Sequence, residues 1–303
     1  MTRRIKKFGE IEDHYELIEH IGGGAQGDLY LAHGLGTGEP VAIKIQREQE
    51  FESDRSFAEL ARELTREGVF SHLVSDGPGG TLQLFGMGDY QGRRCIVMEY
   101  VDGVLLYDLM TNFRPIKDVA TVASIIGQLC EILDDVHRKG FVHRDLKPEN
   151  VMVEHSGRVR LLDLGLSVLA RQGTRHGCGT IGYAPPEQLT ATADGVTARA
   201  DVFALGCLLL EMTVMQLPYG GTRTGITAIP PVVLPADRLA LVPKPFTALA
   251  LSMVEFTAEK RPASVREVFE CLRPHLPTVD GPRPVKPLRP DPTEYYRTRP
   301  PRW

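Results

Sequence analysis

The sequence predicts an α+β protein in which a β-rich part comes first and a mainly helical part follows. Between residues 15 and 45, apolar and polar residues alternate in three short runs separated by glycine and proline, the pattern of an antiparallel meander. Residues 118–139 instead carry apolar residues at helical spacing, as expected of a core helix. With 303 residues, the chain is long enough for one two-lobed unit with a buried core and a tail.

Composition and charge exclude several classes of protein. Hydrophobic residues make up 42% and charged residues 24%, which is ordinary for a globular chain, and the net charge of −4 gives no indication of a nucleic-acid partner. The five cysteines are scattered and form no Cys-x-x-Cys pair, which argues against a disulfide framework or a zinc site. The N-terminus lacks the apolar run of a signal peptide, and the longest nearly apolar run, 202–210, is too short to span a membrane. We expect a cytoplasmic protein with no membrane span.

Strands and one helix are expected in the first hundred residues. A glycine run at 22–27 connects the first two strands, and without side chains its backbone amides can approach a phosphate closely. The expected order is strands at 15–18, 28–32 and 41–45, a helix at 51–73, and strands at 81–85 and 95–98.

The stretch 143–150 carries side chains suited to phosphoryl transfer. Asp145 supplies a carboxylate, Lys147 an ammonium group and Asn150 a carboxamide. These groups can hold a hydroxyl nucleophile beside a metal-bound phosphate. The stretch therefore predicts a catalytic loop.

Three further motifs occur around this loop in a fixed order. The glycines at 22–27 are followed by Lys44 at the end of a Val-Ala-Ile-Lys run, and an apolar strand ends at Asp163 in an Asp-Leu-Gly sequence. With the catalytic loop, this series resembles a eukaryotic-type (Hanks-type) serine/threonine protein kinase of the bacterial kind. The resemblance extends over residues 15–276.

The resemblance implies a bilobal protein kinase-like fold with ATP in the cleft between the lobes. A β-rich N-lobe at 15–98 would be joined by a hinge at 99–103 to a mainly helical C-lobe at 104–276. Residues 1–14 would then be an N-terminal extension, and residues 277–303 a tail rich in proline and arginine.

The resemblance also implies roles for individual side chains. Asp145 would be the catalytic base, Lys147 would neutralise charge on the γ-phosphate, and Lys44 would contact the α- and β-phosphates. Asn150 and Asp163 would ligate Mg²⁺. The residues expected to bind ATP are Ile21, Gly22, Gly24, Gly27, Leu29, Ala42, Lys44, Met98, Glu99, Val101 and Met152.

Lys44 is expected to pair with a glutamate of the helix at 51–73. Residues three and four positions apart share a helix face, so an inward-facing glutamate needs apolar residues at those offsets. Glu67 has Leu64 and Phe70 there, whereas Glu63 would bring charged residues inward with it. Glu67 is therefore favoured, and Glu63 is the alternative.

Further residues are implied to support the catalytic loop. Thr180 would bond the catalytic aspartate and lysine, and Asp201 would hold the loop backbone. Arg261 would form an ion pair with Glu187. Thr174, which lies between two arginines, is the expected activating phosphosite, because nearby guanidinium groups can bind its phosphate.

The implied function is Mg²⁺-dependent transfer of the γ-phosphate of ATP to serine or threonine of proteins, including the chain itself. A pseudokinase scaffold is one alternative, but such chains usually lack equivalents of Lys44, Asp145 or Asp163. A small-molecule phosphotransferase is the other, but it would not be expected to carry the segment 179–187. The expected cofactors are therefore ATP and Mg²⁺, and the expected partners are protein substrates.

The composition of residues 277–303 predicts a polyproline-type or disordered tail. Residues 284–287 and 287–290 match the minimal P-x-x-P pattern, so partner docking through the tail is one possibility. The alternative is that the tail folds back onto the catalytic domain through Tyr295, Tyr296 and Trp303.

Overall fold

A computed structural model describes the chain at residues 5–24, 27–48, 56–74, 80–112, 115–164, 167–170, 179–189, 195–219 and 233–303. The chain divides into two compact units, Met1–Asp102 and Gly103–Trp303. The first, which we call the N-terminal unit, is β-rich, and the second, the C-terminal unit, is mainly helical. The predicted α+β order is confirmed.

The N-terminal unit is built on a six-stranded sheet with the order β1-β5-β6-β4-β3-β2. Its neighbouring strands are antiparallel, except that β1 runs parallel to β5. The elements are β1 (Lys6–Glu10), a 3-10 turn η1 (Ile11–Asp13), β2 (Tyr15–Gly23), β3 (Gly27–Gly34), β4 (Pro40–Gln46), α1 (Phe57–Val74), β5 (Leu84–Tyr90) and β6 (Arg93–Glu99).

Strand β1 lies within residues 1–14, which were expected to form an N-terminal extension. It pairs with β5 and buries Phe8 in the same cluster as Ile11. The close approach depends on Gly86, where a Cβ atom would lie 2.5 Å from both the Lys6 carbonyl oxygen and the Phe8 ring. The pattern around residues 6–10 alternates too weakly to predict this strand.

Helix α1 packs closely against the sheet through Gly68. A Cβ atom there would lie 2.6 Å from Cε of Met87 on β5 and 3.0 Å from Cγ2 of Ile96 on β6. Leu60 and Leu64 are buried on the same face of the helix. This face also carries Glu67, which is 3% exposed, so the packing places a carboxylate in the interior of the unit.

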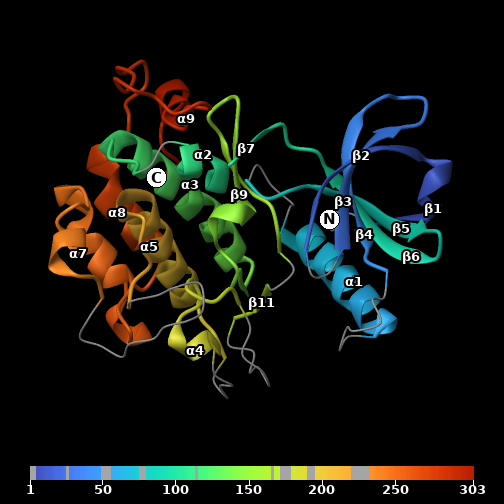
Figure 1. Cartoon of the computed structure of the whole chain (residues 1–303), viewed down its shortest axis with the longest axis horizontal. Helices are drawn as coiled ribbons and strands as arrows, with labels where there is room; N and C mark the ends of the chain where they lie inside the picture. The colour runs from blue at the N-terminus through green and yellow to red at the C-terminus, as the bar shows by residue number, and fades with distance from the viewer. Residues whose placement is uncertain are drawn as a thin grey trace. The chain divides into compact units, whose positions relative to one another are not determined.

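The C-terminal unit contains helices and short strands (Figure 1). The strands pair antiparallel in the orders β10-β9-β7 and β11-β8. The elements are β7 (Gly103–Leu105), α2 (Leu106–Asn112), α3 (Val119–Arg138), β8 (Phe141–Val142), η2 (Pro148–Asn150), β9 (Val151–Glu154), β10 (Val159–Leu161), β11 (Val168–Leu169), α4 (Pro186–Leu189), α5 (Arg199–Val214), α6 (Ala236–Leu239), α7 (Lys244–Met253), η3 (Ala258–Lys260), α8 (Val265–Leu272), η4 (Arg273–His275) and α9 (Glu294–Thr298).

Helices α3 and α5 form the centre of this unit. Residues of α5 are buried on all sides of the helix, as expected of a helix that is apolar all round, and α3 is likewise buried all round from Thr121 to Leu133. Asp118 caps α3, because its side chain accepts a hydrogen bond from the Thr121 amide at 2.8 Å. Across the described ranges, we find no helix with the length and apolar character needed to cross a bilayer.

The tail at 277–303 is folded, so its prediction as a polyproline-type or disordered segment was wrong. Tyr296 is fully buried and Leu288 nearly so, and both belong to the core formed by α3, α5 and α8. Trp303 packs edge to face on Phe269 of α8, with ring centroids 4.9 Å apart. The alternative, in which the tail folds back, is confirmed. A few large side chains are enough to hold the tail on the C-terminal unit, because they are buried against a core that the rest of the unit already forms.

Candidate active site

In the N-terminal unit, Lys44 and Glu67 form a buried ion pair. Lys44 lies on β4, between β3 and β6, and its Nζ donates to Glu67 Oε2 of α1 at 2.7 Å. Their side chains are 12% and 4% exposed, so the pair is shielded from water. Glu67, rather than Glu63, is thus the partner of Lys44, as the apolar neighbours of Glu67 indicated.

The glycine loop joins β2 to β3, and its glycines differ in what surrounds them. A Cβ atom on Gly27 would lie 2.5 Å from the carbonyl oxygen of Ile45, so this glycine allows β3 and β4 to approach. A Cβ atom on Gly22 or Gly24 would meet nothing within 4 Å among the described residues. Packing therefore gives no reason for these two glycines, although φ of +156° at Gly22 already favours glycine there. A ligand that approaches the backbone would account for the open space at both positions. Ala25 and Gln26 lie outside the described residues.

The other residues expected to bind ATP lie on neighbouring strands or in the segment after β6. Ala42 on β4 is paired with Met98 on β6, and both are buried. The Glu99 amide donates to the Gln83 carbonyl at 2.9 Å, and its side chain accepts from the Gln83 amide at 3.2 Å. Ile21 and Leu29 lie on β2 and β3, Val101 follows β6, and Met152 lies on β9 in the C-terminal unit.

In the C-terminal unit, the catalytic loop brings Asp145, Lys147 and Asn150 together. Asp145 Oδ1 accepts a hydrogen bond from the Thr180 hydroxyl at 2.5 Å, and Asp145 Oδ2 accepts one from Asn150 Nδ2 at 3.0 Å. Lys147 Nζ lies 3.2 Å from the same Oδ2 and donates to Thr180 Oγ1 at 3.0 Å. The carboxylate is therefore held from both sides, next to a positive charge. The bonds expected of Thr180 are present.

Asp201 of α5 binds the backbone of this loop through hydrogen bonds. Its carboxylate accepts hydrogen bonds from the His143 and Arg144 amides, each at 2.9 Å, and lies 2.7 Å from His137 Nε2. Burial alone would raise the pKa of Asp201, but the hydrogen bonds from His137 and the Arg144 amide, with the electrostatic influence of His143, outweigh it and lower that pKa. Arg144 has φ +71°, a left-handed conformation that costs a non-glycine residue about 1–2 kcal/mol. The bonds to Asp201 offset this strain.

Asn150 and Asp163 lie on neighbouring chain segments, and each carries a side-chain oxygen of the kind that binds a hard cation. The Leu162 amide donates to the Asn150 carbonyl at 2.9 Å, which brings the chain segments of the two residues together. Asn150 uses its side-chain nitrogen for Asp145, so its side-chain oxygen remains as the group able to bind a cation. Asp163 is half-buried. One carboxylate and one carboxamide oxygen fit Mg²⁺, which shares its shell with phosphates and water.

The ion pair expected between Glu187 and Arg261 is present and bidentate. Arg261 Nη1 donates to Glu187 Oε1 at 2.6 Å, and Nη2 donates to Oε2 at 3.0 Å. The guanidinium is completely buried and lies 4.8 Å from the ring centroid of Phe203. It also donates to the backbone carbonyls of Glu255 and Phe256. The pair therefore joins α4, which follows Thr180, to the core of the unit.

Two supporting residues were missed by the sequence analysis. His137 binds Asp201, and its position in the last turn of a core helix, just before the catalytic loop, is a signal that could have been used. Gln188 Nε2 donates to the Arg144 carbonyl at 2.6 Å and is buried. No pattern around Gln188 distinguishes it from a surface glutamine. Thr174 lies outside the described residues, so its expected role stays a prediction.

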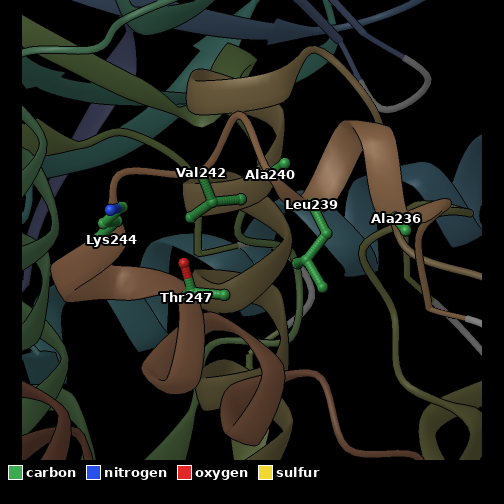
Figure 2. A pocket seen from close by; sticks show the side chains of 6 residues that line it. All are labelled: Ala236, Leu239, Ala240, Val242, Lys244 and Thr247. Carbon is green, nitrogen blue, oxygen red and sulfur yellow. The ribbon is translucent and has the colours of Figure 1, made fainter.

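A separate pocket of about 390 Å³ opens between α6 and α7 (Figure 2). Its lining is mostly apolar, and it contains none of the residues expected to bind ATP, Mg²⁺ or substrate. Figure 2 shows the Leu239 side chain at the end of α6 and the Val242 side chain on the segment that joins the two helices. The lining residues are Ala236, Leu239, Ala240, Val242, Lys244 and Thr247. With no carboxylate in its lining, this pocket is not a candidate for the chemistry.

Comparison with known proteins identifies the family of the chain. A family described as the protein kinase domain matches residues 15–270. The serine/threonine-protein kinase PknB of Mycobacterium tuberculosis (strain H37Rv) is 30% identical over 296 residues, covering 89% of this chain and 45% of PknB. PrkC of Bacillus subtilis, also a serine/threonine-protein kinase, is 30% identical over 215 residues, covering 70% of this chain and 32% of PrkC. The chain thus spans less than half the length of these curated relatives.

Proposed function

The chain belongs to the protein kinase family, and on that premise we propose that it transfers the γ-phosphate of ATP to serine or threonine hydroxyls of proteins. One observation carries the proposal. The Asp145 carboxylate is held at Oδ1 by Thr180 and at Oδ2 by Asn150, with Lys147 3.2 Å away. This is the arrangement of a base that is oriented toward a hydroxyl and kept beside a cation.

In the proposed reaction, Asp145 accepts a hydrogen bond from the substrate hydroxyl, orients its oxygen toward the γ-phosphorus and takes its proton. Lys147 neutralises negative charge on the phosphoryl group as it moves. Thr180 and Asn150 limit the rotation of the carboxylate, so the base is in place before the substrate binds. The serine/threonine preference rests on Lys147, two residues after the base, and on the names of the relatives.

We propose that the N-terminal unit binds the nucleotide. Glu67 holds the Lys44 ammonium group at 2.7 Å, which fixes a flexible side chain for contact with the α- and β-phosphates. The open space around Gly22 and Gly24 suits the approach of phosphate oxygens to the backbone. Within this unit, Ile21, Leu29, Ala42 and Met98 supply apolar surface for the purine, and the backbone of Glu99 and Val101 would bind its edge. Met152, which belongs to the C-terminal unit, stays an expected contributor to the purine site.

Asn150 and Asp163 are the proposed ligands of Mg²⁺. When bound, the ion neutralises charge on the β- and γ-phosphate oxygens. The Leu162–Asn150 backbone hydrogen bond would keep the two ligands at a constant separation, and the bonds from Asn150 to Asp145 would keep the carboxamide oxygen turned away from the base.

We also propose that protein chains, including this one, are the substrates. Support comes from Thr180, whose hydroxyl ties the segment 179–187 to the base and the lysine. A small-molecule phosphotransferase has no need for such a segment beside its base.

We keep Thr174 as the proposed activating phosphosite. The described cysteines, Cys95, Cys130, Cys207 and Cys271, are free, which supports a reducing, cytoplasmic location.

Partner docking through the tail remains a second proposal, but the fold limits which residues of the tail a partner could contact. Val285 is 97% exposed, whereas Leu288 and Pro290 are buried. The second P-x-x-P match is therefore partly covered by the protein itself, and a partner would have to bind near residues 282–286.

The test is incubation with labelled ATP and Mg²⁺, followed by mapping of phosphosites by mass spectrometry. We expect label on serine and threonine of the chain and of an added protein, and its loss in Asp145→Asn. Asp237→Asn, an equally conservative change at an exposed carboxylate of α6, is the matched control and is expected to keep the label. Equal labelling in Asp145→Asn would contradict the proposal, and labelling in neither chain would favour a pseudokinase.

A further inference from the structure

The folded tail rests directly on the turn between β9 and β10. Gly157 in this turn has φ +81°, and a Cβ atom there would lie 2.3 Å from the Asp291 carbonyl oxygen. The same Cβ would also lie 3.0 Å from Cβ of Glu294 and 3.3 Å from the Tyr295 amide nitrogen. The backbones of the tail and the hairpin thus approach so closely that only glycine fits in the turn.

A buried side chain joins the tail, the hairpin and α3. Gln128 Nε2 donates to the Gly157 carbonyl at 3.1 Å and to the Pro292 carbonyl at 3.2 Å. Gln128 Oε1 accepts from the Val159 amide at 2.8 Å. Since Gln128 is 2% exposed, water competes little for these bonds. Displacement of the tail would remove the hydrogen bond from Gln128 Nε2 to the Pro292 carbonyl and leave that buried donor without this acceptor.

The far end of the tail is attached to α3 and α8. Glu131 accepts a hydrogen bond from the Tyr296 hydroxyl at 3.1 Å and one from the Arg302 amide at 3.2 Å. Arg302 Nη1 lies 2.8 Å from Asp135 Oδ2, and Trp303 packs on Phe269. Figure 1 shows α9, in red, at the upper edge of this unit. The tail is therefore held on α3 and α8 on the C-terminal side of its contact with the hairpin.

The opposite end of the β9–β10 hairpin carries the proposed Mg²⁺ ligands. Asn150 immediately precedes β9, and Asp163 follows shortly after β10. The strands are in register from Val153 and Val159 to Val151 and Leu161, and the Leu162–Asn150 hydrogen bond continues the ladder to the ligands. A short, paired hairpin transmits a shift at its turn to its open end, because its backbone bonds leave little slack.

We propose that the tail is a positioning segment for the metal site. By holding the turn at Gly157, it keeps the β9–β10 hairpin in the one placement that sets the separation of the Asn150 and Asp163 oxygens. This inference rests on the proposed function, since it assigns Mg²⁺ to those two residues. It predicts that loosening the tail weakens metal use, although no tail residue is a metal ligand.

Two single substitutions in the full chain test the coupling from its two sides. Gly157→Ala places a methyl group against the Asp291 carbonyl oxygen on the hairpin side. Asp291→Ala acts on the tail side, where the carboxylate accepts bonds from the Thr293 amide and hydroxyl at 3.0 and 2.7 Å. Gly92→Ala is the control for strain, because Gly92 has φ +75° and nothing within 4 Å of the added Cβ.

Three measurements are made on each variant. Fluorescence of Trp303, the only tryptophan, reports whether the tail is docked. Hydrogen–deuterium exchange over residues 150–163 reports the hairpin, including the Leu162 amide. Initial rates of ATP turnover on myelin basic protein, measured against Mg²⁺ concentration, report the metal site.

We expect both test variants to speed exchange over 150–163 and to raise the half-saturating Mg²⁺ concentration by about tenfold, the lower end of effects seen for residues that support metal ligands. The KM for the protein substrate is expected to stay unchanged, and Gly92→Ala is expected to match the unaltered chain. The proposal is overturned if either test variant exposes Trp303 while exchange and Mg²⁺ dependence stay as before, or if both behave like the unaltered chain throughout. If the unaltered chain shows no turnover at any Mg²⁺ concentration, the proposed function fails, whereas the exchange data still decide whether tail and hairpin are coupled.

Discussion

Replacing Glu187 by glutamine is expected to destabilise the C-terminal unit, because it leaves the buried guanidinium of Arg261 without its anionic partner. Arg261 is completely buried, and its two hydrogen bonds to Glu187 are 2.6 and 3.0 Å long. Glutamine keeps the shape of the side chain, removes its charge and replaces one acceptor oxygen by an NH2 group, so one of the two hydrogen bonds from Arg261 is lost with the charge. The change therefore measures the ion pair rather than a cavity.

The magnitude follows from the burial of the two partners. Removing one member of a buried pair typically costs about 3–5 kcal/mol. The Glu187 carboxylate is 24% exposed, so some of its interaction is screened by water and the lower end, about 3 kcal/mol, is the better estimate. For a unit of this size, such a loss corresponds to a fall in Tm of roughly 6–12 °C.

The assay is thermal and urea unfolding of the Glu187→Gln chain beside a matched control. Glu270→Gln removes the same charge from an exposed pair with Arg273, whose side chains are 49% and 41% exposed, and it is expected to change Tm little. The reasoning is refuted if Glu187→Gln unfolds within the error of the unaltered chain, or if Glu270→Gln destabilises the chain equally.

Three further predictions concern the nucleotide site, the loop and the tail. Glu67→Gln is expected to lower the rate of ATP turnover by about tenfold or more, because a hydrogen bond between charged groups contributes about 1.5–3 kcal/mol. The control, Glu63→Gln, is expected to leave the rate nearly unchanged. Similar losses of rate in both variants would contradict the assignment of Glu67 as the partner of Lys44. Thr174→Ala is expected to lower the initial rate on an added protein, and an unchanged rate would show that phosphorylation there does not control activity. Burial raises the pKa of Glu131 against the opposing effect of its bonds to Arg302, Tyr296 and Tyr295, so the folded chain binds this proton more tightly than the unfolded chain. The free energy of unfolding, measured relative to that of Glu131→Gln, is therefore expected to fall as the pH rises above 4.5, the ordinary pKa of a glutamate. Urea unfolding at several pH values measures this difference. A rise or no change with pH would show that the carboxylate is not buried beneath the tail.

The sequence alone determined the parts of the site that are local. The stretch 143–150 holds Asp145, Lys147 and Asn150 within a few residues, so any fold of that loop keeps them near one another. The choice of Glu67 also followed from local spacing, since helix geometry decides which residues share a face. The strand and helix order followed for the same reason, because periodicity is a property of neighbouring residues.

Contacts between distant segments could be predicted from the sequence only where the resemblance to a known family indicated them. The bonds from Asp201 to the catalytic loop and from Arg261 to Glu187 join residues far apart in the chain, and no spacing rule predicts such partners. His137 and Gln188 show the limit, because each supports the loop through a long-range contact that its neighbours in sequence do not reveal.

Only the tertiary structure decided what the two ends of the described chain do. Strand β1 depends on Gly86, which lets the Phe8 ring approach β5, and the tail depends on Gly157, Gln128 and Glu131, which receive it. Composition averaged over the tail reads as unable to build a core. That average omits the surface of α3 and α8, against which Tyr296 and Trp303 bury their rings, and burial against another segment cannot be read from the segment itself.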